Sequence, residues 1–178
     1  MKHFSIFSFL VILSLALSAQ SNRELMNNFM KNDANIVYWQ LVRDTELTRN
    51  ELLDAIIESG YFTNIDVTGD KVVCELRPYR LNYEQYSRSG LDLAPAYLTQ
   101  NLIAGTVIIE LSNNRYRTTV KNIRFIDNTQ AGLGIVTPIE YWVLNRSQDL
   151  KFSLFKNGSE LLDKDFTVKT AFRRTEGF

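Results

Sequence analysis

Few of the residue types that carry enzyme chemistry occur in this chain. Its 178 residues include one histidine, His3, and one cysteine, Cys74. We expect His3 to be removed with an export signal, which leaves no imidazole to act as general base, proton shuttle or metal ligand. A lone cysteine forms neither an intramolecular disulfide nor a zinc site of cysteine and histidine ligands, and no glycine-rich phosphate loop, HExxH or calcium-loop pattern occurs. The sequence therefore excludes histidine-assisted nucleophilic catalysis, and we expect no metal and no other cofactor.

The lone thiol has the pattern of a core residue. Cys74 alternates with Val72 and Leu76, so its face of a predicted strand is apolar. A reactive thiol needs a cationic neighbour to lower its pKa, and Arg77 could supply one if the fold placed it beside the thiol. We predict a buried, unreactive cysteine.

Carboxylates alone could support glycoside hydrolysis without histidine. Asp163 and Asp165 are close in sequence, but they alternate with lysine near the end of the chain, which indicates an exposed helix face. The sequence pattern indicates no pair of residues that could act as nucleophile and general base, so we assign no catalytic residue. The sequence favours a non-catalytic protein, with a carboxylate-dependent hydrolase acting on envelope or dietary glycans as the alternative.

A stretch rich in tyrosine and arginine is the first candidate binding site. It lies in and beside a long connection, residues 80–103, and connections longer than about 12–15 residues are often functional. Tyrosine offers a stiff surface with a polar tip and arginine a planar donor, which suits protein interfaces, glycan stacking or carboxylate capture. Alternatively, the spacing of three of the tyrosines indicates one helical turn packed on the sheet edge. The candidate residues are Arg77, Tyr79, Arg80, Tyr83, Tyr86, Arg88 and Tyr97.

A cationic stripe along a predicted strand is the second candidate. It could bind an anionic glycan or the acidic edge of a partner, or it could be a solvated strand face that discourages edge pairing. Small-ligand capture on the open face of the sheet is a third possibility, which the sequence does not separate from the first. The stripe consists of Arg115, Arg117, Lys121 and Arg124.

The N-terminus has the layout of a cleaved secretory signal. A short basic start precedes an apolar run, and small residues precede a polar stretch, so we assign residues 1–19 to a signal peptide rather than a membrane anchor. Cleavage could follow Ser18 or Ala19. We expect an exported protein, periplasmic or secreted, with no transmembrane segment after cleavage and with a flexible leader over residues 20–34.

The next segments predict a strand, a helix and two hairpins. Residues 36–42 are β-branched and aromatic, and Thr48-Arg-Asn-Glu51 is a capping box that begins a helix. Residues 61–67 and 71–79 form one hairpin through a glycine turn, and residues 105–111 and 115–125 form another. Along the last strand the apolar residues change parity, which predicts a β-bulge near Lys121-Asn122.

Two helices are predicted to follow. Thr137 stands as the cap of a short helix with a proline at its first position, and residues 159–172 have roughly helical spacing, although a strand also suits them. This order predicts an α+β fold: a single antiparallel sheet in the order strand, helix, four strands, helix, with helices packed on one face. We expect residues 35–178 to form a single domain.

Three segments carry a resemblance to a known family. They are Ile36-Val-Tyr-Trp-Gln-Leu41, Thr48-Arg-Asn-Glu-Leu-Leu53 and Asn114-Arg-Tyr-Arg-Thr-Thr-Val-Lys-Asn-Ile-Arg-Phe125. Over about residues 35–126 the chain resembles an uncharacterised family of small exported bacterial proteins with a fold like that of the TATA-box-binding protein. The resemblance implies that fold and no established activity, and the insertion at residues 80–103 departs from the family pattern.

The charge balance gives no support to DNA binding. Lysine plus arginine and aspartate plus glutamate number 20 each, so no net field attracts nucleic acid. The sequence therefore predicts an exported, non-catalytic binding or interaction module of unknown ligand, which acts in the periplasm or at the cell envelope on a protein or envelope component.

Overall fold

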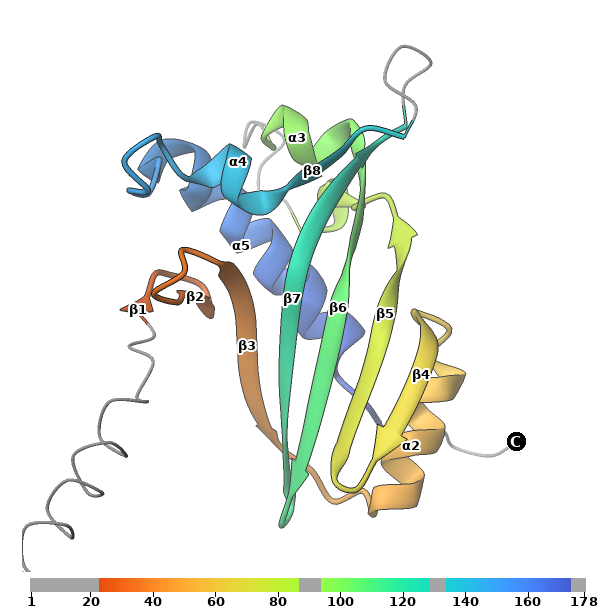
Figure 1. The fold of residues 1–178 in the computed structure, drawn as a ribbon. Coiled ribbons are helices and arrows are strands. Elements are labelled where there is room, and N and C mark those ends of the chain that lie inside the picture. Colours follow the sequence, from red (N-terminus) through yellow and green to blue (C-terminus); the bar gives the residue numbers. More distant parts are fainter. Residues whose placement is uncertain (1–22, 87–93, 129–133, 174–178) are drawn as a thin grey trace, which may run out of the picture.

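The computed structural model describes residues 23–86, 94–128 and 134–173, and its main feature is one twisted antiparallel sheet (Figure 1). The predicted signal, residues 1–19, and the candidate residue Arg88 lie outside the described residues. The strands follow the order β1-β2-β3-β7-β6-β5-β4, and β8 pairs with β7. The strands are β1 (Arg23–Glu24), β2 (Phe29–Lys31), β3 (Val37–Asp44), β4 (Phe62–Thr68), β5 (Lys71–Tyr79), β6 (Asn101–Ser112), β7 (Arg115–Asp127) and β8 (Val136–Pro138).

The two longest helices of the described chain cover the same face of this sheet. Figure 1 shows α5 crossing diagonally behind β7 and β6, and α2 lying behind β4, while the near face of the central strands carries no helix. This arrangement confirms the predicted α+β fold with helices on one face. The helices are α2 (Arg49–Glu58), the 3-10 turn η1 (Tyr83–Gln85), α3 (Ala96–Thr99), α4 (Ile139–Val143) and α5 (Phe152–Lys169). None of the helices in the described ranges has the length and apolar character needed to cross a bilayer.

The core lies between the sheet and α5. Antiparallel register places Trp39, Val120, Val107 and Cys74 in one row across four strands, and all four are buried. The Trp39 ring meets Phe166 of α5 edge-on at 5.6 Å between centroids. Alternation along the strands therefore gives the sheet one apolar face, as the sequence predicted.

The capping box at the start of α2 is formed as predicted. The Thr48 backbone N–H donates to the Glu51 carboxylate at 2.8 Å, and the Glu51 N–H donates to the Thr48 hydroxyl at 3.4 Å. Leu52 and Ile56 are fully buried, whereas Ile57 is 58% exposed. The helix therefore packs on the sheet by a narrow apolar stripe.

The bulge in β7 is also confirmed. Thr106 pairs with Lys121 and Ala104 with Arg124, so β7 contains one residue more than β6 between these pairs. Asn122 takes φ +50° there, and a Cβ on Gly105 would lie 3.1 Å from the Lys121 carbonyl. Because asparagine tolerates the left-handed conformation and glycine lets the two backbones approach, the bulge is accommodated at these two residues.

The leader differs from the prediction of a mobile or weakly helical segment. In its described part, β1 and β2 add two short strands beside β3. Phe29 is fully buried, and its ring meets Phe155 of α5 edge-on at 5.5 Å. Phe29, together with the partly buried Leu25 and Met26 that pack against the core, therefore holds this segment on the rest of the fold.

Two predictions for the C-terminal part need correction. The segment predicted as residues 159–172 is a helix, but α5 begins at Phe152 and runs through Gly158 without a break. Thr137 does not cap α4: it lies in β8, and Pro138 stands at the cap position without a side-chain hydrogen bond. The Glu140 carboxylate accepts from the Val37 backbone N–H at 2.7 Å.

Candidate functional site

The tyrosines of the first candidate site turn inward onto α5. The Tyr79 hydroxyl donates to one oxygen of Asp165, and the Tyr86 hydroxyl donates to the other at 3.2 Å. Lys169 donates to the same carboxylate at 2.7 Å, and its ammonium lies 4.2 Å from the centre of the Tyr79 ring. Asp165 is 1% exposed, so this cluster is an internal anchor for the start of the insertion.

The titration behaviour of these groups reflects burial next to a carboxylate. Burial and then the charge of Asp165 raise the pKa of Tyr79 well above its usual value. The same two causes raise the pKa of Tyr86 to about 12. Burial also raises the pKa of Cys74 to about 12, and the thiol is 1% exposed, which confirms the buried cysteine. These groups keep their protons near neutral pH and offer no nucleophile.

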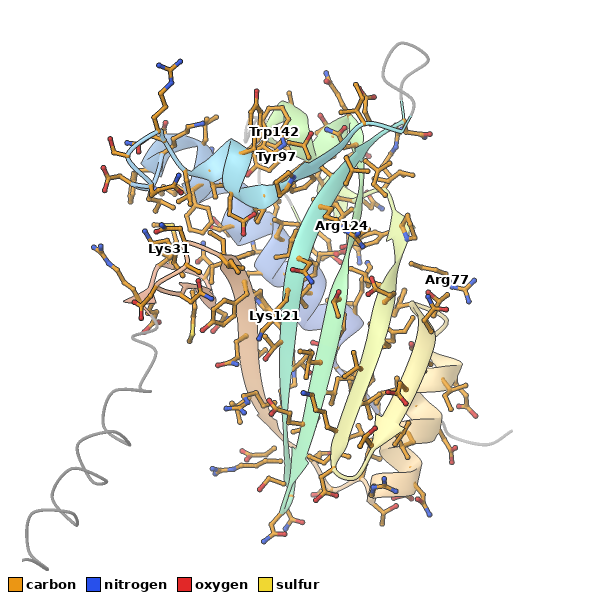
Figure 2. The ribbon with its side chains drawn as sticks, in the orientation of Figure 1. Lys31, Arg77, Tyr97, Lys121, Arg124 and Trp142 are labelled. Carbon is orange, nitrogen blue, oxygen red and sulfur yellow. The ribbon has the colours of Figure 1, made fainter. Side chains whose placement is uncertain are left out.

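Tyr97 belongs to a second internal cluster. Its ring stacks on Trp142 at 5.5 Å and meets Phe125 edge-on at 5.0 Å. Figure 2 shows Tyr97 and Trp142 together where α3 and α4 meet at one end of the sheet. The Tyr97 hydroxyl donates to the Leu154 carbonyl at 3.4 Å. Tyr97 therefore packs the core and offers no binding surface.

The remaining residues of the first candidate site do not form one surface with these tyrosines. Arg77 and Arg80 are exposed and Tyr83 is half-buried, and Figure 2 shows Arg77 at the outer side of β5. Among the described residues, no hydrogen bond or ring contact joins the side chain of either arginine to a tyrosine of this site. The single helical turn considered for Tyr79, Tyr83 and Tyr86 is wrong, since Tyr79 ends β5 and Tyr83 begins η1.

The carboxylates proposed for a hydrolase are structural. Asp163 was expected on an exposed helix face, but its Oδ1 accepts from the Trp39 indole and from the Asn28 amide, each at 2.7 Å. Asp165 holds the tyrosine cluster described above. Both side chains are thus occupied in fixing α5 to the sheet, which removes the observation that favoured the hydrolase.

The arginines of the second candidate site are paired with carboxylates. Arg115 lies 2.8 Å from Asp44, Arg117 lies 2.7 Å from Glu110, and Arg124 lies 3.4 Å from Glu75. Lys121 has a different environment: its ammonium stands 5.8 Å from the centre of the Tyr38 ring. The stripe is therefore a face of mixed charge, in which Lys121 is available to a ligand.

Part of this stripe borders a hollow on the uncovered face. The hollow has a volume of about 370 Å³, within the range of about 300–1,000 Å³ usual for small-molecule sites. Three cations and one carboxylate face it. Its lining residues are Asn32, Ile36, Tyr38, Gln40, Lys71, Ile108, Glu110, Arg117, Thr119, Lys121 and Asn122.

Strand register brings the charged side chains together. Lys71 of β5 stands opposite Glu110 of β6, which stands opposite Arg117 of β7. Within the parts of the chain that the structure describes, neither Lys71 nor Lys121 forms an ion pair. The stripe contained Arg117 and Lys121, but Lys71 comes from another strand, and only the pairing of strands could have added it.

Polar side chains complete the hollow. The Gln40 amide donates to the Thr119 hydroxyl at 2.9 Å, and the bulge residue Asn122 donates to Thr106 at 3.4 Å. Tyr38 lies under Lys121, and burial raises the pKa of its hydroxyl while Arg117 lowers it. The hollow therefore presents hydrogen-bonding groups and cations, most of them from strands.

The described surface has two further hollows, both larger than this one. One of about 820 Å³ borders Tyr141, Trp142 and Lys151, and one of about 720 Å³ borders Asp44 and Glu46. Across the described ranges, no three His, Cys, Asp or Glu side chains gather in a way that could hold a metal ion.

The Asp165 cluster gives a test of the internal anchor. Removing one partner of a buried ion pair leaves an uncompensated charge, so Asp165→Asn should lower the free energy of unfolding by about 3–5 kcal/mol in urea denaturation. Asp44→Asn is the matched control, since its ion pair with Arg115 joins side chains that are 83% and 64% exposed, and it should cost less than about 1 kcal/mol. Equal losses in the two variants would contradict the assignment.

Comparison with known proteins adds two solved structures. One, described as a DUF4468 family protein from Bacteroides ovatus ATCC 8483, has a TM-score of 0.48 and 12% identity, with 80% of this chain and 91% of that chain covered. The other, described as a TBP-like protein from Parabacteroides distasonis ATCC 8503, has a TM-score of 0.46 and 13% identity, with 76% and 90% covered. No protein-family model and no curated protein matches the sequence.

Proposed function

We propose that the protein is an exported, non-catalytic binding module whose ligand lies on the uncovered face of the sheet. The observation that carries this proposal is the hollow in which Lys71 and Lys121, without ion pairs to any described residue, stand beside polar side chains from four strands. Two ammonium groups and Arg117 outweigh one carboxylate, Glu110, so the hollow suits a small polar anion or the anionic part of an envelope component.

This location is favoured over the insertion for a structural reason. Tyr79 and Tyr97, the best-placed aromatic residues of the insertion site, are committed to contacts with α5 and with Trp142. The hollow, by contrast, stands on strands whose backbones are fixed by hydrogen bonds on both sides. Side chains on rigid elements hold a binding geometry better than side chains on loops.

Export is part of the proposal. The layout of residues 1–19 supports a cleaved signal, and a chain with balanced charge and a small ligand site is suited to capture in the periplasm or outside the cell. The partner is then a component of that compartment.

Ligand binding can be measured by thermal unfolding of the purified protein. The panel is hexuronates, sugar phosphates, inorganic phosphate and the matching neutral sugars. We expect the anions alone to raise the midpoint, because a ligand at a hundredfold excess over its Kd stabilises the native state by about 2.7 kcal/mol.

Paired variants locate the site. The double variant Lys71→Gln with Lys121→Gln should lose the ligand-induced rise, while Arg77→Gln with Arg80→Gln, which removes the same charge from the insertion, should keep it. The opposite pattern would move the site to the insertion, and an unchanged midpoint across the whole panel would refute binding of a small anion.

Export has its own test. When the full chain is expressed in a bacterium, we expect the protein in the periplasmic or culture fraction with a mass that lacks the first 18 or 19 residues. A full-length protein in the cytoplasmic fraction would show that residues 1–19 do not act as a signal.

A further inference from the structure

We infer that the ligand is a short acidic glycan whose anionic groups are separated by neutral, hydroxyl-bearing parts. This inference rests on the proposed binding at the uncovered face. It follows from the order of side chains across the hollow, where neutral residues lie between two ammonium groups that form no ion pair within the described residues.

The two lysines stand at opposite corners of the hollow. Lys71 lies on β5 and Lys121 on β7, with β6 between them. On β6, Lys71 pairs with Glu110 and Lys121 pairs with Thr106, four residues away from Glu110. With strands about 4.8 Å apart and a rise of about 3.4 Å per residue, their Cα atoms are about 17 Å apart. The ammonium groups meet at one anion only if both side chains extend fully toward each other, so a ligand with two separated anionic groups satisfies them better.

The middle of the hollow is neutral. Ile108 of β6 lies midway between Glu110 and Thr106, the partners of the two lysines, and Thr119 of β7 stands opposite it. Glu110 lies beside Lys71, and its carboxylate is bound to Arg117 at 2.7 Å. A continuous polyanion would place charge against these neutral side chains and against this carboxylate, whereas a hydroxyl can donate to the lone pairs of the carboxylate or of threonine. The pattern of cation, neutral side chains and cation therefore matches a ligand in which anionic groups are separated by neutral, hydroxyl-bearing parts.

The rest of the lining supports a sugar over a peptide. Asn32, Gln40 and Asn122 supply amide groups, which both donate to and accept from hydroxyls. The backbone groups of the central strands are already paired in the sheet, so they are not available to pair with a peptide. Tyr38, the aromatic residue of the lining, is 6% exposed and offers no broad apolar pocket for a peptide side chain.

Isothermal titration calorimetry of the purified protein with galacturonate oligomers tests the inference. We expect trigalacturonate to bind at least tenfold more tightly than monogalacturonate, and the neutral galactotriose not to bind. Lys71→Gln and Lys121→Gln should each weaken trigalacturonate binding at least tenfold, toward the affinity of the monomer. The control Lys156→Gln, an exposed lysine of α5 away from the hollow, should leave the affinity unchanged, and thermal unfolding confirms that each variant is folded.

Comparison ligands separate the ways in which the inference can fail. If monogalacturonate or inorganic phosphate binds as tightly as the trimer, the site holds one anion and the inference is overturned while the proposed function stands. Equal binding of tripolyphosphate would overturn the separation of the anionic groups by hydroxyls. Equal binding of triglutamate would overturn the preference for a sugar. If none of these compounds binds, the inference and the proposed function fail together.

Discussion

The structure depends on the attachment of α5 to one face of the sheet through two buried or half-buried carboxylates. Asp163 accepts from Trp39 and Asn28 at one place on the helix, and Asp165 accepts from Tyr79, Tyr86 and Lys169 at another. A buried carboxylate is stable only when hydrogen-bonded or paired. These contacts therefore fix the position of α5 over the central strands, join the N-terminal strands to the C-terminal helix, and hold the start of the insertion against the core.

This attachment leaves the opposite face of the sheet for a ligand. Once Trp39, Val120 and Val107 face α5, alternation sends Gln40, Thr119 and Ile108 to the other side. The bulge at Asn122 changes this alternation, so that the buried Ile123 and Phe125 keep contact with the core while Asn122 turns toward the hollow. The covering of one face and the chemistry of the other thus follow from the same register.

Much of the fold could be predicted from the sequence because its signals are local. The capping box at Thr48, the glycine turn at Gly69 and the parity change after Val120 each depend on residues a few positions apart. The leader was mispredicted because the partners of its main core residue, Phe29, are Phe155 and Phe166, which lie far along the chain. The roles of Asp163 and Asp165 escaped prediction for the same reason, since a carboxylate on a helix shows no sign of a distant tyrosine or indole.

The candidate site could be predicted only within one strand. Arg117 and Lys121 were identified because they alternate on β7, but Lys71, Tyr38 and Gln40 join them through the pairing of β5, β6, β7 and β3. The tyrosines of the insertion were wrongly predicted to form a binding surface, because tyrosine and arginine together are typical of an interface. Their hydrogen-bond partner, Asp165, is 86 residues from Tyr79 and 79 residues from Tyr86 in sequence, so no local pattern shows the contact.

Two neighbouring isoleucines allow the most direct test of ligand binding on the uncovered face. Ile108 borders the hollow, whereas Ile109 is fully buried on the covered face. In methyl NMR spectra of isoleucine-labelled protein, saturating trigalacturonate, or inorganic phosphate as a second anion, should shift the Ile108 and Ile36 methyl signals and leave Ile109 in place. Shifts confined to Ile103, which pairs with Tyr79 at the start of the insertion, or no shift at Ile108, would contradict binding on this face.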